Sequence, residues 1–542
     1  MKKSLMYYLS ILLIVSFTLV GCSSNEKTES QQDGDGPIKI KVFGPQNADT
    51  NLETNSFTKL VEEKFNIDLE WQVTTYDATS ASEVRNIALA SGDYPDLFLL
   101  VPWVDQFSQT DLLRYGKQGV VLPLNDLIDQ YAPNIKEVLE NHPYYASMVT
   151  APDGNIYGLP HLNECFHCSY GNKLWINTDW LEKLKLDMPQ TTEDLKTVLT
   201  KFKTQDPNGN GKQDEVPLSG SPALVESSII PYLMNGFIYD DSRSRLIMKN
   251  GKVDLAANKE EWKEGLSYIR SLYEEGLIYK GAFSQNTEAQ QKLGNNAEAQ
   301  IVGASTAMHP GVFVTEEKYS KFYDAAPPLK GPHSAYTTYN FPSTPGGAFV
   351  LTNNASEEAQ IAAIKLVDYM FTGEGRILSH HGEKDVSWRE PKEGEVAIEE
   401  GVEPNLAQIP LGDGEKPRND NWGAQSQYYH SREFRDGLVQ ATDIYTAEGY
   451  ERRLQEATHL YEGKEASEVF PHWAIWIDPA VADETAMIKT NIEEYIEQNA
   501  LQFITGSKDL DKDWDSYVKG FEQLDLKRYL EIMQEAYDNS SL

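Results

Sequence analysis

The stretch Ile38-Lys39-Ile40-Lys41-Val42-Phe43-Gly44 decides the fold class, because it alternates apolar and charged residues and then becomes apolar. That pattern predicts a strand entering a sheet. Apolar residues then recur at helical spacing over 57–65, and the segments 67–71 and 97–101 predict two more strands, with a helix at 84–89 between them. Strand, helix, strand, helix, strand is typical of a parallel sheet covered by helices.

The rest of the chain continues this α/β pattern. Apolar spacing predicts a helix over 262–277, a strand over 347–352 and a buried helix over 361–371. With 542 residues the chain is too long for one ordinary domain, so we expect two large units. The sequence contains no internal repeat and no P-loop, HExxH or GxSxG motif.

The N-terminus predicts export and a lipid anchor. Two lysines precede a short apolar run over 5–20, which is typical of a secretory signal peptide and too short for a comfortable membrane span. Leu19-Val20-Gly21-Cys22 resembles the lipobox of bacterial lipoproteins, in which a diacylglycerol is attached to the cysteine and cleavage makes that cysteine residue one. We expect a signal peptide at 1–21 and lipidation of Cys22; an ordinary signal peptide with a chance cysteine is the alternative.

Residues 22–36 follow as a polar segment with no aromatic or aliphatic side chain. Such a segment cannot bury enough surface to offset its ordering entropy. We expect a flexible tether with an r.m.s. span of roughly 20 Å. The predicted location is therefore the outer face of the cell membrane, with the protein held there by lipid.

Charge limits the possible partners. The formal net charge of −35 argues against nucleic acid, and against charge-driven binding to an anionic lipid surface. A glycoside hydrolase needs two carboxylates at a set separation. With 83 acidic residues, suitable-looking pairs are unavoidable and carry no information.

The segment Cys165-Phe166-His167-Cys168 admits several chemistries. The candidates are a disulfide in a small loop, half of a zinc site, a redox pair, or two inert thiols. Zinc would need further ligands, and the sequence has no second C-x-x-C. A redox enzyme would need a thioredoxin-like frame, which the sequence does not indicate. In an exported protein we expect a disulfide between Cys165 and Cys168 rather than free thiols.

Residues 206–215 read Asp-Pro-Asn-Gly-Asn-Gly-Lys-Gln-Asp-Glu and match the start of an EF-hand-type calcium loop. Oxygen-bearing side chains stand at loop positions one, three, five and nine, and glycine stands at six. The glutamate that is usual at position twelve is replaced by Pro217. The spacing favours a structural calcium ion; a surface turn that binds nothing is the alternative.

Segments spread over nearly the whole chain resemble one protein family. They are residues 19–22, 91–97 (SGDYPDL), 122–128 (LPLNDLI), 153–160 (DGNIYGLP), 174–177 (LWIN), 206–215, 346–350 (GGAFV), 374–375 and 503–517. In number and order they resemble the family-1 extracellular solute-binding lipoproteins of ABC sugar importers, in the long branch that includes alginate-oligosaccharide binders.

The resemblance implies a two-lobe α/β fold of the periplasmic-binding-protein type, with a hinge and a ligand cleft between the lobes. Lobe 1 would comprise residues 37–156 and 347–375, and lobe 2 would comprise residues 157–346 and 376–542, with the C-terminal helices able to contact both. It further implies a monomer without enzymatic activity that binds an oligosaccharide and delivers it to an ABC permease. A ligand-presenting receptor for a membrane sensor and a glycoside hydrolase are the alternatives.

By the same resemblance, the calcium loop is a shortened one. Two acidic residues at its end would close the coordination shell, and one lysine would contribute its backbone carbonyl. The expected ligands are Asp206, Asn208, Asn210, Lys212, Asp214 and Glu215.

Sugar recognition needs flat apolar platforms, together with polar groups that bond to hydroxyls. The candidates are Trp175, Tyr339, Trp388, Trp422, Tyr428, Arg432, Trp473 and Trp476. Trp422 is favoured because it follows the polar run Asn419-Asp420-Asn421, and Trp388 because it follows the stretch where the family approaches its ligand. Core packing is the alternative for any single tryptophan.

Overall fold

A computed structural model describes residues 36–341, 343–412, 414–540 and 542. The predicted signal peptide, Cys22 and the predicted tether up to residue 35 lie outside the described residues. Within the described ranges, no helix combines the length and the apolar character that a membrane span requires.

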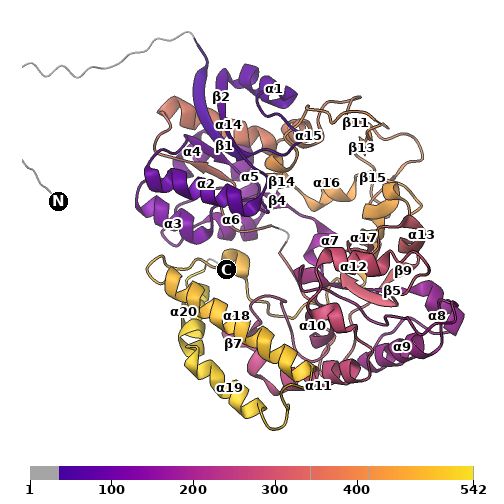
Figure 1. Cartoon of the computed structure of the whole chain (residues 1–542). Coiled ribbons are helices and arrows are strands. Elements are labelled where there is room, and N and C mark those ends of the chain that lie inside the picture. The colour runs from indigo at the N-terminus through magenta and orange to yellow at the C-terminus, as the bar shows by residue number, and fades with distance from the viewer. Residues whose placement is uncertain (1–35, 342, 413, 541) are drawn as a thin grey trace, which may run out of the picture. The chain divides into compact units, whose positions relative to one another are not determined.

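The N-terminal part of the chain forms a mostly parallel sheet with the strand order β10-β3-β1-β2. Figure 1 shows β1 and β2 of this sheet beside each other. β1 (Ile38–Pro45) runs parallel to β2 (Ile67–Thr74) and to β3 (Leu97–Leu99). β10 (Phe349–Leu351) lies antiparallel beside β3. The strands predicted from the N-terminal sequence are therefore present and adjacent.

The alternation of β1 explains its place in the sheet. Ile40 and Val42 are fully buried, whereas Lys39 points to the surface and donates a 2.5 Å hydrogen bond to Glu70 of β2. Apolar residues therefore face the core, while an exposed lysine and glutamate pair across the neighbouring strands.

Helices cover this sheet. α1 (Ser56–Phe65) and α2 (Ala78–Ser91) connect its parallel strands, and α14 (Glu357–Phe371) is the buried helix that the sequence predicts. Asp368 of α14 accepts 2.9 Å hydrogen bonds from the backbone N–H groups of Asn134 and Ile135, at the start of α5 (Pro133–Asn141). The carboxylate thereby satisfies donors that a helix N-terminus leaves unpaired.

A second sheet has the order β8-β5-β9 and is antiparallel throughout. Its strands are β5 (Lys173–Asn177), β8 (Ala304–Ala307) and β9 (Tyr323–Ala326). The helices that contribute to the surrounding core include α9 (Thr192–Thr204), α11 (Glu260–Glu274), α18 (Ala482–Ile504), α19 (Trp514–Gln523) and α20 (Leu526–Asp538). α11 corresponds to the helix predicted over 262–277.

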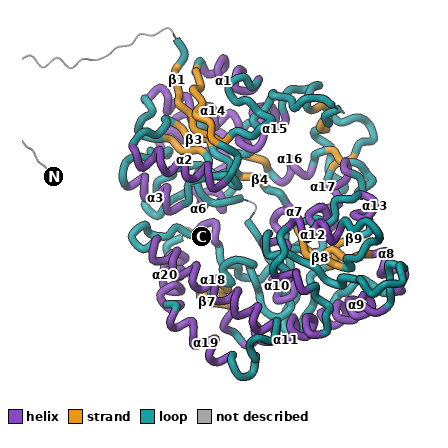
Figure 2. The backbone as a smooth tube through the Cα atoms, in the orientation of Figure 1, coloured by secondary structure: helices purple, strands orange, loops and turns teal. Residues whose placement is uncertain are grey.

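Shorter elements complete the described chain (Figure 2). Their bounds are α3 Gln109–Lys117, α4 Asn125–Tyr131, α6 Pro143–Val149, β4 Leu162–Asn163, α7 Phe166–Ser169, α8 Thr178–Leu184, α10 Ile229–Met234, β6 Leu246–Lys249, β7 Lys252–Leu255, α12 Thr287–Gly294, α13 Glu317–Ser320, α15 Gly373–His381, β11 Trp388–Arg389, β12 Val396–Ala397, β13 Ala407–Gln408, β14 Tyr429–His430, α16 Arg432–Asp436, β15 Val439–Gln440 and α17 Tyr450–His459.

Buried apolar residues gather in two large cores. The first core draws on residues between 40 and 162 and between 348 and 371, and it also includes Trp422 and Tyr428. The second core draws on residues between 166 and 536. Trp422 and Tyr428 therefore belong with the first core, although the boundaries inferred from sequence assigned them to lobe 2. The reason is that a large apolar surface near the start of the chain accepts both rings.

The segments that pass between the two cores lie side by side. Leu159 pairs with Phe349 across an antiparallel bridge, and β4 runs parallel to β14. The hydroxyl of Ser343 donates a hydrogen bond to the carbonyl of His161. Backbone from three distant parts of the sequence is therefore held together where the cores meet.

Candidate functional site

The parallel strands of the first sheet all end at one edge. β1 ends at Pro45, β2 at Thr74 and β3 at Leu99, so the loops that follow these strands emerge together. In open α/β sheets, ligands bind outside the carboxyl ends of the strands. This edge is therefore the first place to look for a binding surface.

Trp103 is the most unusual residue of that edge. It lies in the loop after β3 and is 58% exposed, although a free indole of this size is normally covered. Tyr76, in the loop after β2, is 37% exposed. Burial raises the pKa of Tyr76, and the neighbouring indole of Trp103 opposes that rise, so the two aromatic side chains lie near each other.

The loop that carries Trp103 has a rigid base. Asp105 accepts a 2.8 Å hydrogen bond from Arg85 of α2, and both side chains are buried. The guanidinium of Arg85 also lies 4.5 Å from the ring centre of Phe107. Burial raises the pKa of Asp105, and Arg85 opposes that rise. A buried pair of this kind is costly to break, so it anchors the loop two residues after Trp103.

Three of the predicted sugar-binding residues are core residues. Trp175 is fully buried in β5, where its indole donates to the carbonyl of Ala307 at 3.0 Å. Trp422 is 3% exposed and Tyr428 is fully buried, both in the first core. Their predicted role as ligand platforms is wrong for this structure, because no face of these rings reaches the surface.

The remaining predicted sugar-binding residues already contact neighbouring side chains or backbone groups. Tyr339 packs edge-on against Tyr170. The Trp388 indole donates to the carbonyl of Gly382 at 3.0 Å. Arg432 lies 3.9 Å above the ring of Phe166 and pairs with Asp436 and Glu462. Trp473 stacks on Phe341, and Trp476 is buried in a small cluster with Phe43, Leu113 and Tyr157.

Sequence reasoning missed Trp103 and Tyr76. The available signal was positional: each follows a strand that the N-terminal pattern predicts, at the carboxyl end where ligands bind. The polar run before Trp422 predicts an exposed indole at that position instead, but the structure places Trp422 in the first core.

The loop 206–215 has the form of a cation site. Asp206 accepts hydrogen bonds from the backbone N–H groups of Asn210 (3.2 Å) and Gly211 (3.0 Å), and the N–H of Lys212 donates to the Asn210 amide oxygen (2.7 Å). The Asn210 side chain also donates to Asp214 at 3.0 Å. These hydrogen bonds bring the side-chain oxygens of the loop together around one turn.

Glu215 has one carboxylate oxygen that its neighbours leave unpaired. Its Oε1 atom is buried and has no hydrogen-bond partner among the residues that the structure describes. Burial raises the pKa of Glu215, and the charges of Asp206 and Asp214 raise it further. Hard oxygen donors with an unpaired buried carboxylate fit a hard divalent cation such as Ca²⁺.

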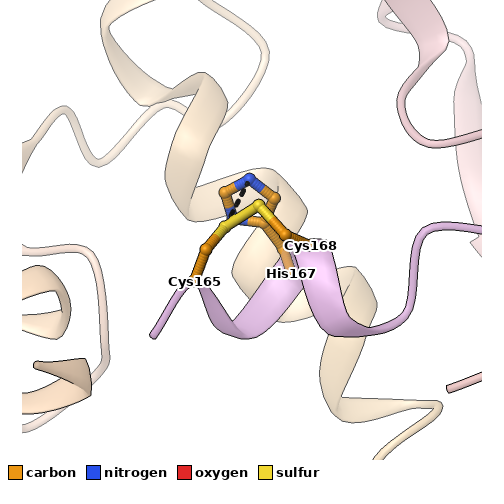
Figure 3. Close-up of side chains that lie close together, drawn as sticks. All are labelled: Cys165, His167 and Cys168. Carbon is orange, nitrogen blue, oxygen red and sulfur yellow. Dashed lines mark hydrogen bonds between the residues drawn. A yellow bond between two sulfur atoms is a disulfide. The ribbon is translucent and has the colours of Figure 1, made fainter. Parts of the chain in front are cut away.

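Cys165 and Cys168 are joined by a disulfide around the short helix α7 (Figure 3). His167 lies between them in sequence, and its imidazole turns toward the sulfur atoms, with Nε2 3.5 Å from the Sγ atom of Cys165. The pairing expected from sequence is the one that the structure contains.

The chain belongs to the bacterial extracellular solute-binding protein family, whose model matches residues 50–377. Among curated proteins it is 30% identical to the fructooligosaccharide ABC transporter substrate-binding protein FusA of Streptococcus pneumoniae, over 88% of this chain and 86% of FusA. This membership confirms the predicted class, a solute-binding protein of the type used by ABC transporters rather than an enzyme.

Solved structures agree on the fold. FusA from S. pneumoniae in complex with kestose matches with a TM-score of 0.68 and 27% identity, covering 92% of this chain and 99% of FusA. An extracellular solute-binding protein from Bifidobacterium longum subsp. infantis matches with a TM-score of 0.76 and 21% identity, over 93% of this chain and 99% of that chain. The predicted α/β fold of the solute-binding type is confirmed.

Proposed function

We propose that this chain captures an oligosaccharide outside the cell and delivers it to the permease of an ABC importer. The observation that carries the proposal is the extent of the match to the fructooligosaccharide-binding relative, which spans 88% of this chain and 86% of the relative. A match of that extent includes both cores and the segments between them. Fructooligosaccharides are therefore the first ligands to test.

The mechanism that we propose is hinge closure between two lobes. The lobes would follow the boundaries inferred from sequence, except that the region around Trp422 and Tyr428 moves with lobe 1, because both residues pack in the first core. The crossing segments near Leu159, Phe349 and β14 would flex. A ligand that contacts both lobes stabilises the closed form, because the open form can offer contacts from one side only.

The surface proposed to receive the sugar is the edge that carries Trp103 and Tyr76. The face of an indole packs well against the apolar face of a sugar ring, and a phenol can hydrogen-bond to sugar hydroxyls. The buried Arg85–Asp105 pair beneath the loop would keep the platform in place before the ligand arrives. Such preorganisation reduces the entropy cost of binding.

Calcium is proposed as a structural ion. Asp206, Asn208, Asn210, Asp214 and Glu215 would contribute side-chain oxygens and Lys212 its backbone carbonyl. The orphaned Oε1 of Glu215 supports this assignment. A solved FusA structure, 27% identical with a TM-score of 0.67, is an EF-hand mutant in complex with fructo-nystose, and an EF-hand in that relative supports the proposal.

Lipidation of Cys22 is proposed to hold the protein at the outer face of the membrane. The family is extracellular, and a 24% identical relative from Bacillus subtilis is named lipoprotein LipO. Two acyl chains are needed for stable retention, which a diacylglycerol supplies. Cys22→Ala should release the protein or leave it unprocessed; a processed mutant that stays with the membrane would contradict the anchor.

The ligand is best identified by thermal-shift screening, since a ligand that binds the folded state raises its stability by mass action. The panel should contain fructooligosaccharides, pectin and alginate fragments, xylan-type oligosaccharides and peptides. The proposal predicts stabilisation by at least one oligosaccharide series. Stabilisation by peptides, with no response to any sugar, would redirect the assignment to peptide uptake.

A further inference from the structure

Four imidazoles gather where α15 meets β14, and the proposed function does not use them (Figure 1). His380 and His381 end α15, His430 lies in β14, and His161 precedes β4. The ring centre of His430 lies 4.6 Å from that of His380 and 6.0 Å from that of His381. His161 packs edge-on against Tyr428, which directly precedes β14, at 4.7 Å. These four residues are called the histidine cluster below.

Packing, rather than hydrogen bonding, holds the rings of the histidine cluster. Both ring nitrogens of His161 are buried without a hydrogen-bond partner among the described residues, and so is Nε2 of His381 and of His430. The ring centre of Phe434, on α16, lies 5.7 Å from the ring centres of both His381 and His430. Uncharged rings therefore join α15, β14 and α16 through their faces and edges.

The charged groups nearest to the histidine cluster are cations. The guanidinium of Arg376, on α15, lies 4.6 Å from the ring centre of Phe434, and its Nε atom has no partner among the described residues. Arg435, on α16, donates a 3.0 Å hydrogen bond to Asn163. In the part of the chain that the structure describes, no carboxylate oxygen lies within 4.0 Å of a ring nitrogen of the cluster.

The carboxylates on the surrounding elements are bonded elsewhere or exposed. Asp436 of α16 accepts a 2.9 Å hydrogen bond from Gln455, and Asp420 accepts a 2.6 Å hydrogen bond from Ser387. Glu451 of α17 lies 3.9 Å from Arg435. The other charged or titratable groups on the elements that pack here are Glu374 of α15 beside Lys64, exposed Glu433 of α16, Glu164 after β4 beside His142, and Tyr429 of β14, which also contacts His142.

Protonation works against this packing. Burial lowers the pKa of His161 to about 3, and the neighbouring His380 lowers it further. Burial also lowers the pKa of His380 to about 4, with a contribution from Arg435. An exposed imidazole takes up its proton near pH 6.5, so the packed form is fully favoured above about pH 6.5 and loses that advantage as the pH falls toward the lowered pKa values. Each added proton would place a further cation beside two guanidiniums.

The histidine cluster lies on the segments that connect the two cores. β14 pairs with β4, and the hydroxyl of Ser343 donates to the backbone carbonyl of His161. α15 directly follows α14 of the first core, and α16 is followed by α17, whose Leu454 belongs to the second core. Separation of the rings would therefore free these segments from one another.

We propose that the histidine cluster is an acid-sensitive latch between the segments that connect the two cores. At neutral pH the uncharged rings hold α15 against β14 and α16. In mild acid the rings take up protons from solvent and this contact opens, without any covalent bond being broken. Hinge closure would use the same segments, so acid should also weaken oligosaccharide capture; this last step rests on the proposed function.

The first test is hydrogen–deuterium exchange of the ligand-free full chain at pH 7.5 and 5.5, in excess calcium and with correction for the intrinsic pH dependence of exchange. For one ring that titrates at pH 6.5 when the latch is open, the opening constant rises about 10-fold between these pH values. Peptides that contain residues 373–381 and 428–436 should therefore exchange about 10-fold faster or more at pH 5.5, whereas peptides from β1 and β2 should not. Equal corrected rates at the two pH values would overturn the latch.

Histidine variants identify the groups that titrate. His381→Gln removes one titrating ring but keeps a polar side chain, so it should reduce the acid-induced increase in exchange. His333→Gln is the matched control, because His333 is exposed and pairs with Glu264, and it should keep the full increase. A full increase in the double variant His381→Gln/His430→Gln would overturn the assignment to these rings. The wild-type comparison decides the proposal even where a variant does not fold.

The second test measures the Kd of the oligosaccharide that gives the largest thermal shift, by calorimetry at the same two pH values. The Kd should rise about 10-fold from pH 7.5 to 5.5 in the wild type, and less in His381→Gln. A Kd that is independent of pH, together with faster exchange at 373–381, would overturn the coupling of the latch to capture. If no oligosaccharide binds at either pH, the proposed function fails, and the exchange measurement still supports or overturns the latch.

Discussion

The indole Nε1 of Trp422 donates a 2.8 Å hydrogen bond to the hydroxyl of Thr58, a residue 364 positions earlier in the sequence. Thr58 in turn donates to the carbonyl of Leu52 at 2.7 Å. The ring of Trp422 meets Phe57 and Trp71 edge-on, with centroid distances of 4.9 and 5.5 Å. A late segment of the chain is thereby locked into the first core by one satisfied indole.

Trp422→Ala should destabilise the protein without directly weakening ligand binding. Losing a buried tryptophan side chain typically costs about 3–5 kcal/mol, and the hydroxyl of Thr58 also loses its donor. Urea unfolding should show a loss of that size, while Trp388→Ala, at a partly exposed site, should cost less. If ligand affinity fell while stability stayed at the wild-type value, Trp422 would have to face the ligand after all.

Calcium chelation should lower the melting temperature. Without a cation, the carboxylates of Asp206, Asp214 and Glu215 repel one another, as the raised pKa of Glu215 indicates. Asp206→Ala should remove the sensitivity to chelator, whereas Asp187→Ala, an equal charge change outside the loop, should keep it. A wild-type melting curve that is the same with and without chelator would show that the loop binds no stabilising ion.

Buried imidazoles predict a loss of stability in mild acid. His161, His381 and His430 are each less than one tenth exposed. Burial lowers the pKa of His161 to about 3 and that of His381 to about 2, and it lowers the pKa of His430 well below its usual value. Unfolded histidine takes up a proton near pH 6.5, so the stability is full above about pH 6.5 and is lost as the pH falls toward the folded pKa values.

Each buried histidine should contribute a slope of about 1.4 kcal/mol per pH unit below that point. Urea unfolding between neutral pH and mild acid measures the slope. His381→Gln should reduce it, whereas Phe434→Leu, which changes the packing on the rings of His381 and His430 without titrating, should leave it unchanged. A flat pH profile in the wild type would mean that these rings are hydrated rather than buried.

Trp103→Ala should weaken oligosaccharide binding by about 10-fold or more, because the packing of a sugar ring on the indole is lost. The substitution disturbs no buried side chain. The melting temperature of the free protein should stay close to the wild-type value. Ile87→Ala, on α2 and 60% exposed, is the matched control and should change neither quantity. Unchanged affinity in Trp103→Ala would exclude this edge as the sugar platform.

Local signals allowed the sequence to predict much of the fold. The alternation that begins at Ile38 and the helical spacing of α14 both reflect which face is buried, and the calcium-type loop follows from the spacing of its own residues. Contacts between distant residues carried no such signal. The contact of Trp422 with Thr58 and the approach of Glu451 to His167 exist only after folding. The polar residues before Trp422 therefore predicted a surface position for a core residue, and no sequence pattern links Glu451 to His167.

The most direct test of oligosaccharide capture is calorimetric titration of the protein with purified oligosaccharides, followed by chromatography of the recovered sugar. We predict binding of one oligosaccharide per chain, with fructooligosaccharides tested first, quenching or enhancement of tryptophan fluorescence on binding, and recovery of the sugar chemically intact. Accumulation of cleaved sugar in molar excess over protein would contradict simple capture and identify a hydrolase. If saturating concentrations of every oligosaccharide produced no heat and no change in fluorescence, sugar capture would be contradicted.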